Sequence, residues 1–169
     1  GNLVVHLEKL EAGVSVVQIV GEFEDKLNAA DLTLLIQKPE TPVYVMADGR
    51  HFWRVIDNLM NNICKYAQPG TRVYVDLREN GGQVELIFRN TSRYPLNISS
   101  EELMERFVRG DESRNTEGSG LGISIAKSLM ELMGGSFMLY VDGDLFKVVL
   151  GFAQMEEEKE PLDEDKSGK

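Results

Sequence analysis

The segment 51–67 constrains the fold more strongly than any other part of the chain. Its apolar residues recur at intervals of three and four, the spacing that places side chains on one face of an α-helix. Asp48 precedes the pattern as a candidate N-cap. A helix of this kind has to bury its apolar face against a second layer. The apolar positions are Phe52, Val55, Ile56, Leu59, Met60 and Ile63.

The second layer is expected to be a β-sheet. Alternating β-branched stretches at 71–77 and 83–88 flank a turn through 79–82 and predict an antiparallel hairpin, and 136–141 with 145–152 predict another, turning at 142–144. Further strands are predicted at 3–7, 33–37 and 43–46, the last two as neighbours, and helices at 14–27 and 120–133. We therefore expect an α+β fold, a two-layer α/β sandwich with a mixed, mostly antiparallel sheet of about five strands packed on three helices.

Composition narrows the class of protein. The 169 residues are 42% hydrophobic, enough for one domain, and 28 acidic against 18 basic side chains give a net charge of -10 that disfavours nucleic acid as a partner. The single cysteine, Cys64, excludes an internal disulfide and indicates a cytoplasmic location. The sequence has no apolar run long enough to span a bilayer, so we expect no direct contact of this domain with a membrane. Residues 155–169 hold seven acids and three lysines, so we expect a domain at 1–154 and an acidic disordered tail.

A long polar connection follows the first hairpin. Residues 90–118 are mostly polar, with a helical patch at 101–107. A connection of this length inside a compact domain is usually functional or mobile. We interpret about 92–118 as a lid.

The helix at 51–67 also carries a polar stripe beside its apolar face, made of Asn58, Asn62, Lys65 and Tyr66. Carboxamide oxygens can hold a hydrated hard cation, a lysine can meet phosphate, and a tyrosine can lie against a base. The same stripe would also suit a solvated helix edge, so it needs a second feature to indicate a site.

That feature is a glycine-spaced turn, Gly118, Gly120 and Gly122 in EGSGLGISIAKSL, which opens the helix at 120–133. Backbone amides before a helix and the helix dipole favour an anion, and missing side chains let phosphates approach closely. The turn is not a P-loop, because no Gly-Lys-Ser/Thr follows, and it lacks the parallel βαβ surroundings of a dinucleotide fingerprint.

In this order and at these separations, the elements resemble the histidine kinase branch of the ATP-binding superfamily shared with gyrase, Hsp90 and MutL. DNLMNNICKYA at 57–67 is similar to the N box of that family, LMERFVRGD at 103–111 to its F box, and GSGLG at 118–122 to its G2 box. The resemblance spans residues 3–152 and implies the Bergerat ATP-binding fold, with ATP and Mg²⁺ as cofactors.

The resemblance also implies roles for particular residues. Asn62 would ligate magnesium with support from Asn58, Lys65 would contact phosphate, and Tyr66 would flank the adenine. From the F box, Arg106 and Arg109 would supply positive charge and Phe107 would contact the nucleotide. The G2 box would line the triphosphate through Gly118, Ser119, Gly120, Leu121 and Gly122.

One motif departs from the family pattern. The G1 box normally begins with an aspartate that accepts the adenine amino group and continues with glycines, whereas the matching stretch here, 88–92, reads FRNTS. Asn90 takes the place of the aspartate. Its carboxamide oxygen can accept the same hydrogen bond, but it is neutral, and no glycine follows it.

The residue at position 58 distinguishes members of the superfamily. Its water-activating ATPases and anti-sigma serine kinases resemble one another in carrying a glutamate there, whereas Asn58 cannot accept a proton at neutral pH. A histidine imidazole already carries a lone pair, so Asn58 favours a histidine kinase. Neither His6 nor His51 lies in a phosphoacceptor motif, and His51 is expected at the surface or as a capping residue.

These observations predict a domain that binds Mg-ATP and donates the γ-phosphoryl group to a histidine on a separate dimerisation domain of a membrane-anchored parent. A response regulator would act downstream. Two alternatives stay open: a degenerate nucleotide-binding docking module, and a serine kinase or ATPase of the anti-sigma type.

Overall fold

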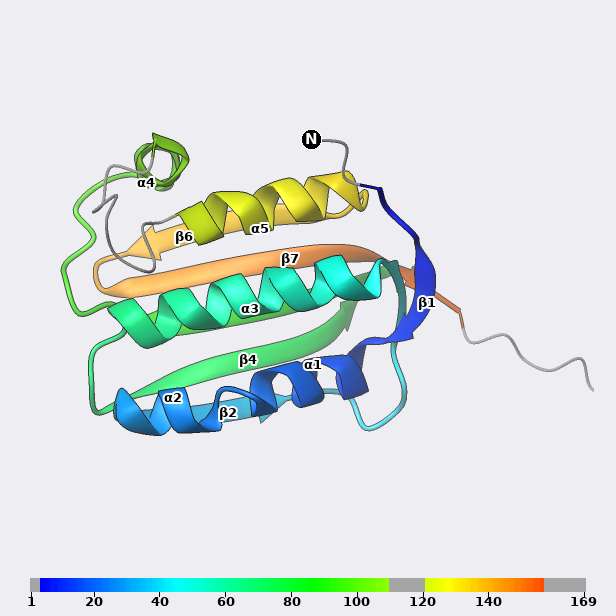
Figure 1. The fold of residues 1–169 in the computed structure, drawn as a ribbon, viewed down its shortest axis with the longest axis horizontal. Helices are drawn as coiled ribbons and strands as arrows, with labels where there is room; N and C mark the ends of the chain where they lie inside the picture. Colours follow the sequence, from blue (N-terminus) through cyan, green and yellow to red (C-terminus); the bar gives the residue numbers. More distant parts are fainter. Residues whose placement is uncertain (1–3, 110–120, 157–169) are drawn as a thin grey trace, which may run out of the picture.

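The computed structural model describes residues 4–109 and 121–156, in which helices cover one face of a β-sheet (Figure 1). The helices are α1 (Ala12–Gly21), α2 (Glu24–Ala29), α3 (Gly49–Tyr66), α4 (Ser100–Arg109) and α5 (Leu121–Leu132). The strands are β1 (Glu8–Glu11), β2 (Leu32–Gln37), β3 (Tyr44–Ala47), β4 (Thr71–Asn80), β5 (Gln83–Thr91), β6 (Ser136–Asp142) and β7 (Leu145–Met155).

The sheet is mixed and mostly antiparallel. Its strand order is β1-β3-β7-β5-β4-β2, and β6 pairs with β7. Only the β2–β4 pair is parallel among the described pairs. The α+β, two-layer prediction is confirmed. The numbers of strands and helices predicted from the sequence were too low, because the described residues form seven strands and five helices rather than about five and three.

Both predicted hairpins are present. In the first, Asn80 pairs with Gln83, so Gly81 and Gly82 alone make the turn. Their φ angles are 56° and 84°, and a two-residue turn with positive φ at both positions matches the twist of the flanking strands. The second hairpin closes the β6–β7 pair through Gly143 and Asp144.

Three local predictions were wrong. The first strand is β1 rather than 3–7, because the backbone that pairs with β3 is the stretch 8–11. The helix predicted at 14–27 is two helices, since the N–H groups of Glu22 and Phe23 bond back to carbonyls only three residues earlier and tighten the turn. The strands β2 and β3 are not neighbours, because β2 pairs with β4 and β3 lies between β1 and β7.

The core lies between the helices and the sheet. The predicted apolar face of α3 is buried along its length, and α3 packs beside α5. In Figure 1 these two helices lie side by side on the sheet, with their axes running roughly along the strands. The largest fully buried side chains include Ile56, Leu59, Met60, Phe88, Ile123, Met130 and Leu150.

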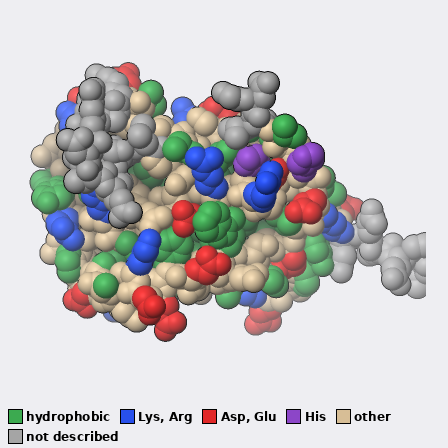
Figure 2. Space-filling model, viewed as in Figure 1, with side chains coloured by type: hydrophobic (Ala, Val, Ile, Leu, Met, Phe, Trp, Pro, Cys, Tyr) green, Lys and Arg blue, Asp and Glu red, His purple; other side chains and the backbone are tan. Residues whose placement is uncertain are grey.

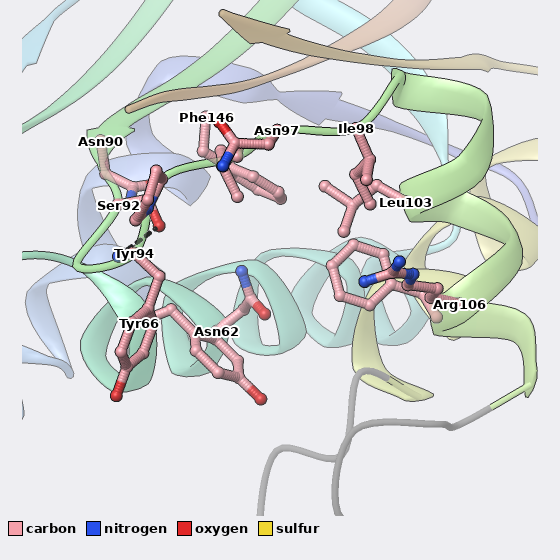
Figure 3. Close-up of a pocket in the computed structure, with 13 residues that line it drawn as sticks. Asn62, Tyr66, Asn90, Ser92, Tyr94, Asn97, Ile98, Leu103, Arg106 and Phe146 are labelled. Atoms are coloured by element: carbon pink, nitrogen blue, oxygen red, sulfur yellow. Dashed lines mark hydrogen bonds between the residues drawn. The ribbon is translucent and has the colours of Figure 1, made fainter. Parts of the chain in front are cut away.

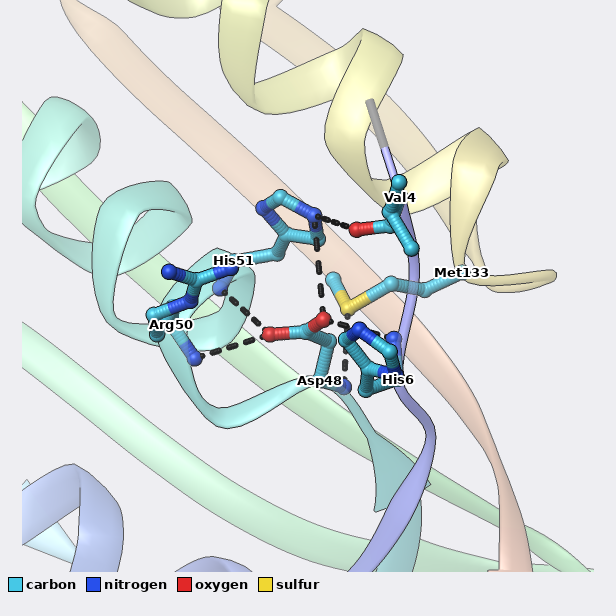
Figure 4. Close-up of polar contacts among 6 residues, drawn as sticks. All are labelled: Val4, His6, Asp48, Arg50, His51 and Met133. Carbon is cyan, nitrogen blue, oxygen red and sulfur yellow. Dashed lines mark hydrogen bonds and ion pairs between the residues drawn. The ribbon is translucent and has the colours of Figure 1, made fainter. Parts of the chain in front are cut away.

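Asp48 fixes the beginning of α3, as predicted (Figure 4). Its carboxylate accepts hydrogen bonds from the backbone N–H groups of Arg50 at 3.0 Å, His51 at 3.3 Å and His6 at 2.8 Å. The imidazole of His51 lies 3.2 Å from the carbonyl oxygen of Val4 and is buried. The surface position considered for His51 was therefore wrong, because the N-terminal segment covers the first turn of α3.

The helical face carries charges of both signs. Figure 2 shows acidic and basic side chains interspersed over this face, with the two histidines close together. Within the described parts of the chain, none of the helices combines the length and the apolar character that crossing a membrane would require.

Candidate functional site

A pocket of about 450 Å³ lies between the C-terminal half of α3, α4 and the segment that follows β5 (Figure 3). A cavity of this volume falls in the range of small-molecule sites. Its lining residues are Asn62, Tyr66, Asn90, Ser92, Tyr94, Pro95, Leu96, Asn97, Ile98, Leu103, Arg106, Phe107 and Phe146.

Helix α3 contributes Asn62 and Tyr66, which lie one helical turn apart and therefore on the same face. Asn62 is only 9% exposed although its side chain is polar. In Figure 3 its carboxamide rises from α3 toward the space enclosed by the segment 92–98. The periodicity that buries the apolar face of α3 thus carries this pair to the floor of the pocket.

Backbone hydrogen bonds hold the opposite rim in place. The N–H of Arg93 donates to the carbonyl of Tyr66 at 2.8 Å, and the N–H of Ser92 donates to the carbonyl of Asp144 at 2.6 Å. The N–H of Leu96 donates to the carbonyl of Gly143 at 3.0 Å. The rim is therefore tied both to the end of α3 and to the β6–β7 turn.

Helix α4 forms the remaining wall. Leu103 and Phe107 are buried, and the ring of Phe107 meets that of Phe146 edge to face at 6.4 Å between centroids. Arg106 reaches the pocket from the same helix, and its guanidinium lies 3.5 Å from the Glu102 carboxylate. Both partners of that pair are well exposed, so solvent screens it and it holds Arg106 only weakly.

Asn90 is the least satisfied polar group of the pocket. Its side chain projects from β5 on the face that carries Phe88 and is 4% exposed. Its Oδ1 makes no hydrogen bond to any described residue. A buried acceptor without a partner costs about 1–3 kcal/mol, so a polar ligand that supplied the missing hydrogen bond would recover that free energy.

Three other predicted residues lie near the pocket but not on its lining: Asn58, Lys65 and Gly122. Asn58 packs against Gly122 in the first turn of α5, where a Cβ on the glycine would lie 3.5 Å from Asn58 Oδ1. Its Nδ2 is buried and makes no hydrogen bond within the described part of the chain. The ammonium of Lys65 lies 5.2 Å from the centroid of the Tyr66 ring.

The remaining predicted site residues lie outside the part of the chain that the structure describes. They are the side chains of Arg109 and Leu121, together with Gly118, Ser119 and Gly120. The last third of the predicted lid, residues 110–118, and most of the predicted tail, residues 157–169, also lie outside the described residues. Of the lid, residues 92–109 form the rim and α4.

The sequence reasoning missed part of the lining. Phe146 belongs to β7 and pairs with Asn90 across the β5–β7 register, so knowing the strand partner would have identified it. Tyr94, Leu96, Asn97 and Ile98 lie in the segment interpreted only as a lid.

The polar side chains of the pocket suit a metal ion that takes few ligands from the protein and fills the rest of its shell with water and phosphate oxygens. No group of three or more His, Cys, Asp or Glu side chains is placed to hold a metal among residues 4–109 and 121–156. The carboxamide of Asn62 can offer one oxygen, which fits magnesium, because that ion usually binds through one or two protein oxygens while waters and phosphate oxygens complete its shell.

Comparison with known protein families gives one match over residues 47–161, to the histidine kinase-, DNA gyrase B-, and HSP90-like ATPases. The chain is 29% identical over 137 residues to the probable sensor kinase SilS of Salmonella typhimurium, covering 79% of this chain and 28% of that protein. It is 34% identical over 110 residues to the probable sensor protein PcoS of Escherichia coli, covering 63% of this chain and 24% of that protein. The chain thus spans about a quarter of the length of these relatives.

Solved structures share the fold. The catalytic domain of histidine kinase ThkA superposes with a TM-score of 0.75 at 18% identity, covering 88% of this chain and 96% of that one. The histidine kinase AdeS of Acinetobacter baumannii superposes with a TM-score of 0.72 at 19% identity, covering 91% of this chain and 70% of that one.

Proposed function

The chain belongs to the family of histidine kinase-, DNA gyrase B-, and HSP90-like ATPases, as the catalytic, ATP-binding domain of a sensor histidine kinase, and we propose that it binds Mg-ATP and donates the γ-phosphoryl group to a histidine on a separate domain of its parent. The parent would be anchored in a membrane with this domain on the cytoplasmic side. Its partners would be the histidine-bearing dimerisation domain and a response regulator.

The observation that carries the proposal is the convergence of Asn62, Tyr66 and Asn90 on one pocket from two separate elements. The sequence places the first two on α3 and the third on β5, 24 residues beyond Tyr66 in the numbering. Folding brings an amide, an aromatic ring and a buried acceptor without a partner to the same cavity. That set suits a ligand with a flat polar base.

The same pocket suits a triphosphate at its opposite end. Arg106 brings a guanidinium, a group that pairs well with phosphate oxygens, and no carboxylate belongs to the described lining. We assign Asn62 to magnesium, with Asn58 supporting from the adjacent turn. Bound magnesium would neutralise phosphate charge. Lys65, Arg109 and the G2 box residues Gly118, Ser119, Gly120, Leu121 and Gly122 are assigned to the phosphates on the family resemblance.

In this proposal the protein acts by positioning. Asn58 lies against α5 and cannot take a proton. The domain therefore has no general base at this position. An attacking imidazole needs none, because its lone pair is already available. The residues of the pocket then hold the γ-phosphoryl group in line with a nucleophile that arrives from elsewhere, while Arg106 offsets negative charge.

Asn62→Ala tests the assignment of the metal ligand. We expect magnesium-dependent ATP affinity, measured by isothermal titration calorimetry, to fall at least tenfold, or about 1.4 kcal/mol. The free energy of unfolding should change much less, because the removed carboxamide lines a cavity.

Asn61→Ala is the matched control, because this neighbouring asparagine lies off the pocket and accepts a hydrogen bond from Lys26 at 2.8 Å. It should leave ATP affinity unchanged. If both variants bind ATP with the same affinity as the unmodified chain, the role of Asn62 is refuted. No ATP binding by the unmodified chain would favour the docking-module alternative.

A further inference from the structure

We propose that the base subsite accepts 6-oxopurine nucleoside triphosphates, of which inosine triphosphate is the simplest, about as well as it accepts ATP. The inference rests on the proposed nucleotide-binding function. It concerns a property that Asn90 gives to this chain, where the family pattern has an aspartate.

The position of Asn90 makes it the polar group best placed to read a base. It lies on β5 between Val73 of β4 and Phe146 of β7, so strands on both sides fix its backbone. Its side chain lines the pocket and is almost completely buried, with an oxygen that has no partner among the described residues. The cost of that orphan acceptor is recovered only when a ligand supplies a complementary edge.

The chemistry of a carboxamide differs from that of a carboxylate in one decisive way. A carboxylate only accepts hydrogen bonds, whereas a carboxamide offers an acceptor and a donor side by side. Adenine presents an amino donor at position 6 beside the acceptor N1. A 6-oxopurine presents the reverse, an acceptor O6 beside the donor N1–H. Turning the amide of Asn90 by 180° exchanges its oxygen and nitrogen within nearly the same volume, so it can match either edge.

The rest of the lining does not restore a preference for adenine. It contains no Asp or Glu among the described residues, so no negative charge repels O6. Ser92 lies two residues beyond Asn90, and its Oγ accepts the N–H of Tyr94 at 3.2 Å. Its hydroxyl can still donate one hydrogen bond, to an oxo group or to a ring nitrogen. The side chains of Asn90 and Ser92 therefore tolerate both kinds of base.

The test compares dissociation constants of ATP and ITP, each with magnesium at constant ionic strength, by isothermal titration calorimetry. The two nucleotides differ only at the 6-position and in the associated proton on N1. For the unmodified chain we expect the constants to agree within tenfold. For Asn90→Asp we expect the preference for ATP to increase at least tenfold, because a carboxylate repels O6 and pairs more strongly with the amino group.

Asn97→Asp is the matched control. Asn97 also lines the pocket but is exposed, so the variant adds the same charge at a different place. It should leave the ratio of the two constants unchanged. A preference of the unmodified chain for ATP of tenfold or more, or an Asn90→Asp ratio equal to that of the unmodified chain, would overturn this inference while leaving ATP binding intact. Failure to bind either nucleotide would instead overturn the proposed function.

Discussion

Replacing Asp48 by alanine should destabilise the domain substantially, because this buried carboxylate holds α3 in position. It caps the helix through the N–H groups of Arg50 and His51 and also accepts the N–H of His6. Losing an N-cap costs about 1 kcal/mol. Losing a hydrogen bond to a charged group costs a further 1.5–3 kcal/mol or so. The expected loss is therefore about 3 kcal/mol.

Urea denaturation followed by circular dichroism measures that loss as a lower midpoint with an unchanged slope. A 3 kcal/mol change should lower Tm by roughly 6–12 °C for a domain of this size. Asp48→Asn is the matched control, because it keeps a capping oxygen and should lose much less. A loss below about 1 kcal/mol for Asp48→Ala would show that the three contacts do not hold the helix.

The stability that Asp48 contributes should also depend on pH. The N–H of His6 is the main cause that holds the pKa of this carboxyl below its ordinary value, against the opposing effect of burial. A lowered folded-state pKa means that the unfolded chain takes up the proton first as pH falls. The ordinary pKa of an aspartate carboxyl, 3.8, marks the upper limit of this effect. The extra stability of the unmodified chain over Asp48→Asn should be complete above that pH and decline below it.

Three further predictions concern other parts of the molecule. Burial is the main cause that raises the pKa of Asp57, so Asp57→Asn should be at least as stable as the unmodified chain at pH 7. Its relative advantage in urea denaturation should decline as pH falls through the folded-state pKa and vanish below the ordinary value of 3.8. Phe107→Ala should lose about 3 kcal/mol in the same assay, whereas Val108→Ala, at a neighbouring position that is 64% exposed, should lose almost nothing. Burial also raises the pKa of the Cys64 thiol, so a thiol reagent at pH 8 should modify the folded chain several times more slowly than the urea-unfolded chain.

The fold was predictable where a pattern is local. The apolar spacing along α3 and the Gly81-Gly82 turn each depend on residues close in sequence, and both predictions were confirmed. Strand partners depend on distant residues. Nothing near 32–37 indicates that β2 pairs in parallel with β4, and nothing near 3–11 indicates which part of that stretch pairs with β3.

The candidate site divides in the same way. The spacing of Asn62 and Tyr66 on one helix indicated a shared face, and the structure places both on the pocket. The F-box resemblance indicated Phe107, which the structure places on the pocket, but its partner Phe146 could not be anticipated, because that contact requires the β5–β7 register and the packing of α4. Asn58 shared the stripe in sequence, yet the packing of α5 through Gly122 covers it.

The transfer of phosphate to a histidine outside this chain is the central claim, and radiolabelled ATP tests it directly. The chain should be incubated with labelled ATP and magnesium alone, with the histidine-bearing domain of its parent, and with that domain after replacement of the acceptor histidine by glutamine. We expect no label on the chain alone and weak label on the acceptor domain, because the tether that raises its local concentration is absent. The glutamine variant should stay unlabelled. Label on the chain alone, or label that persists on the glutamine variant, would contradict the account and favour a serine kinase.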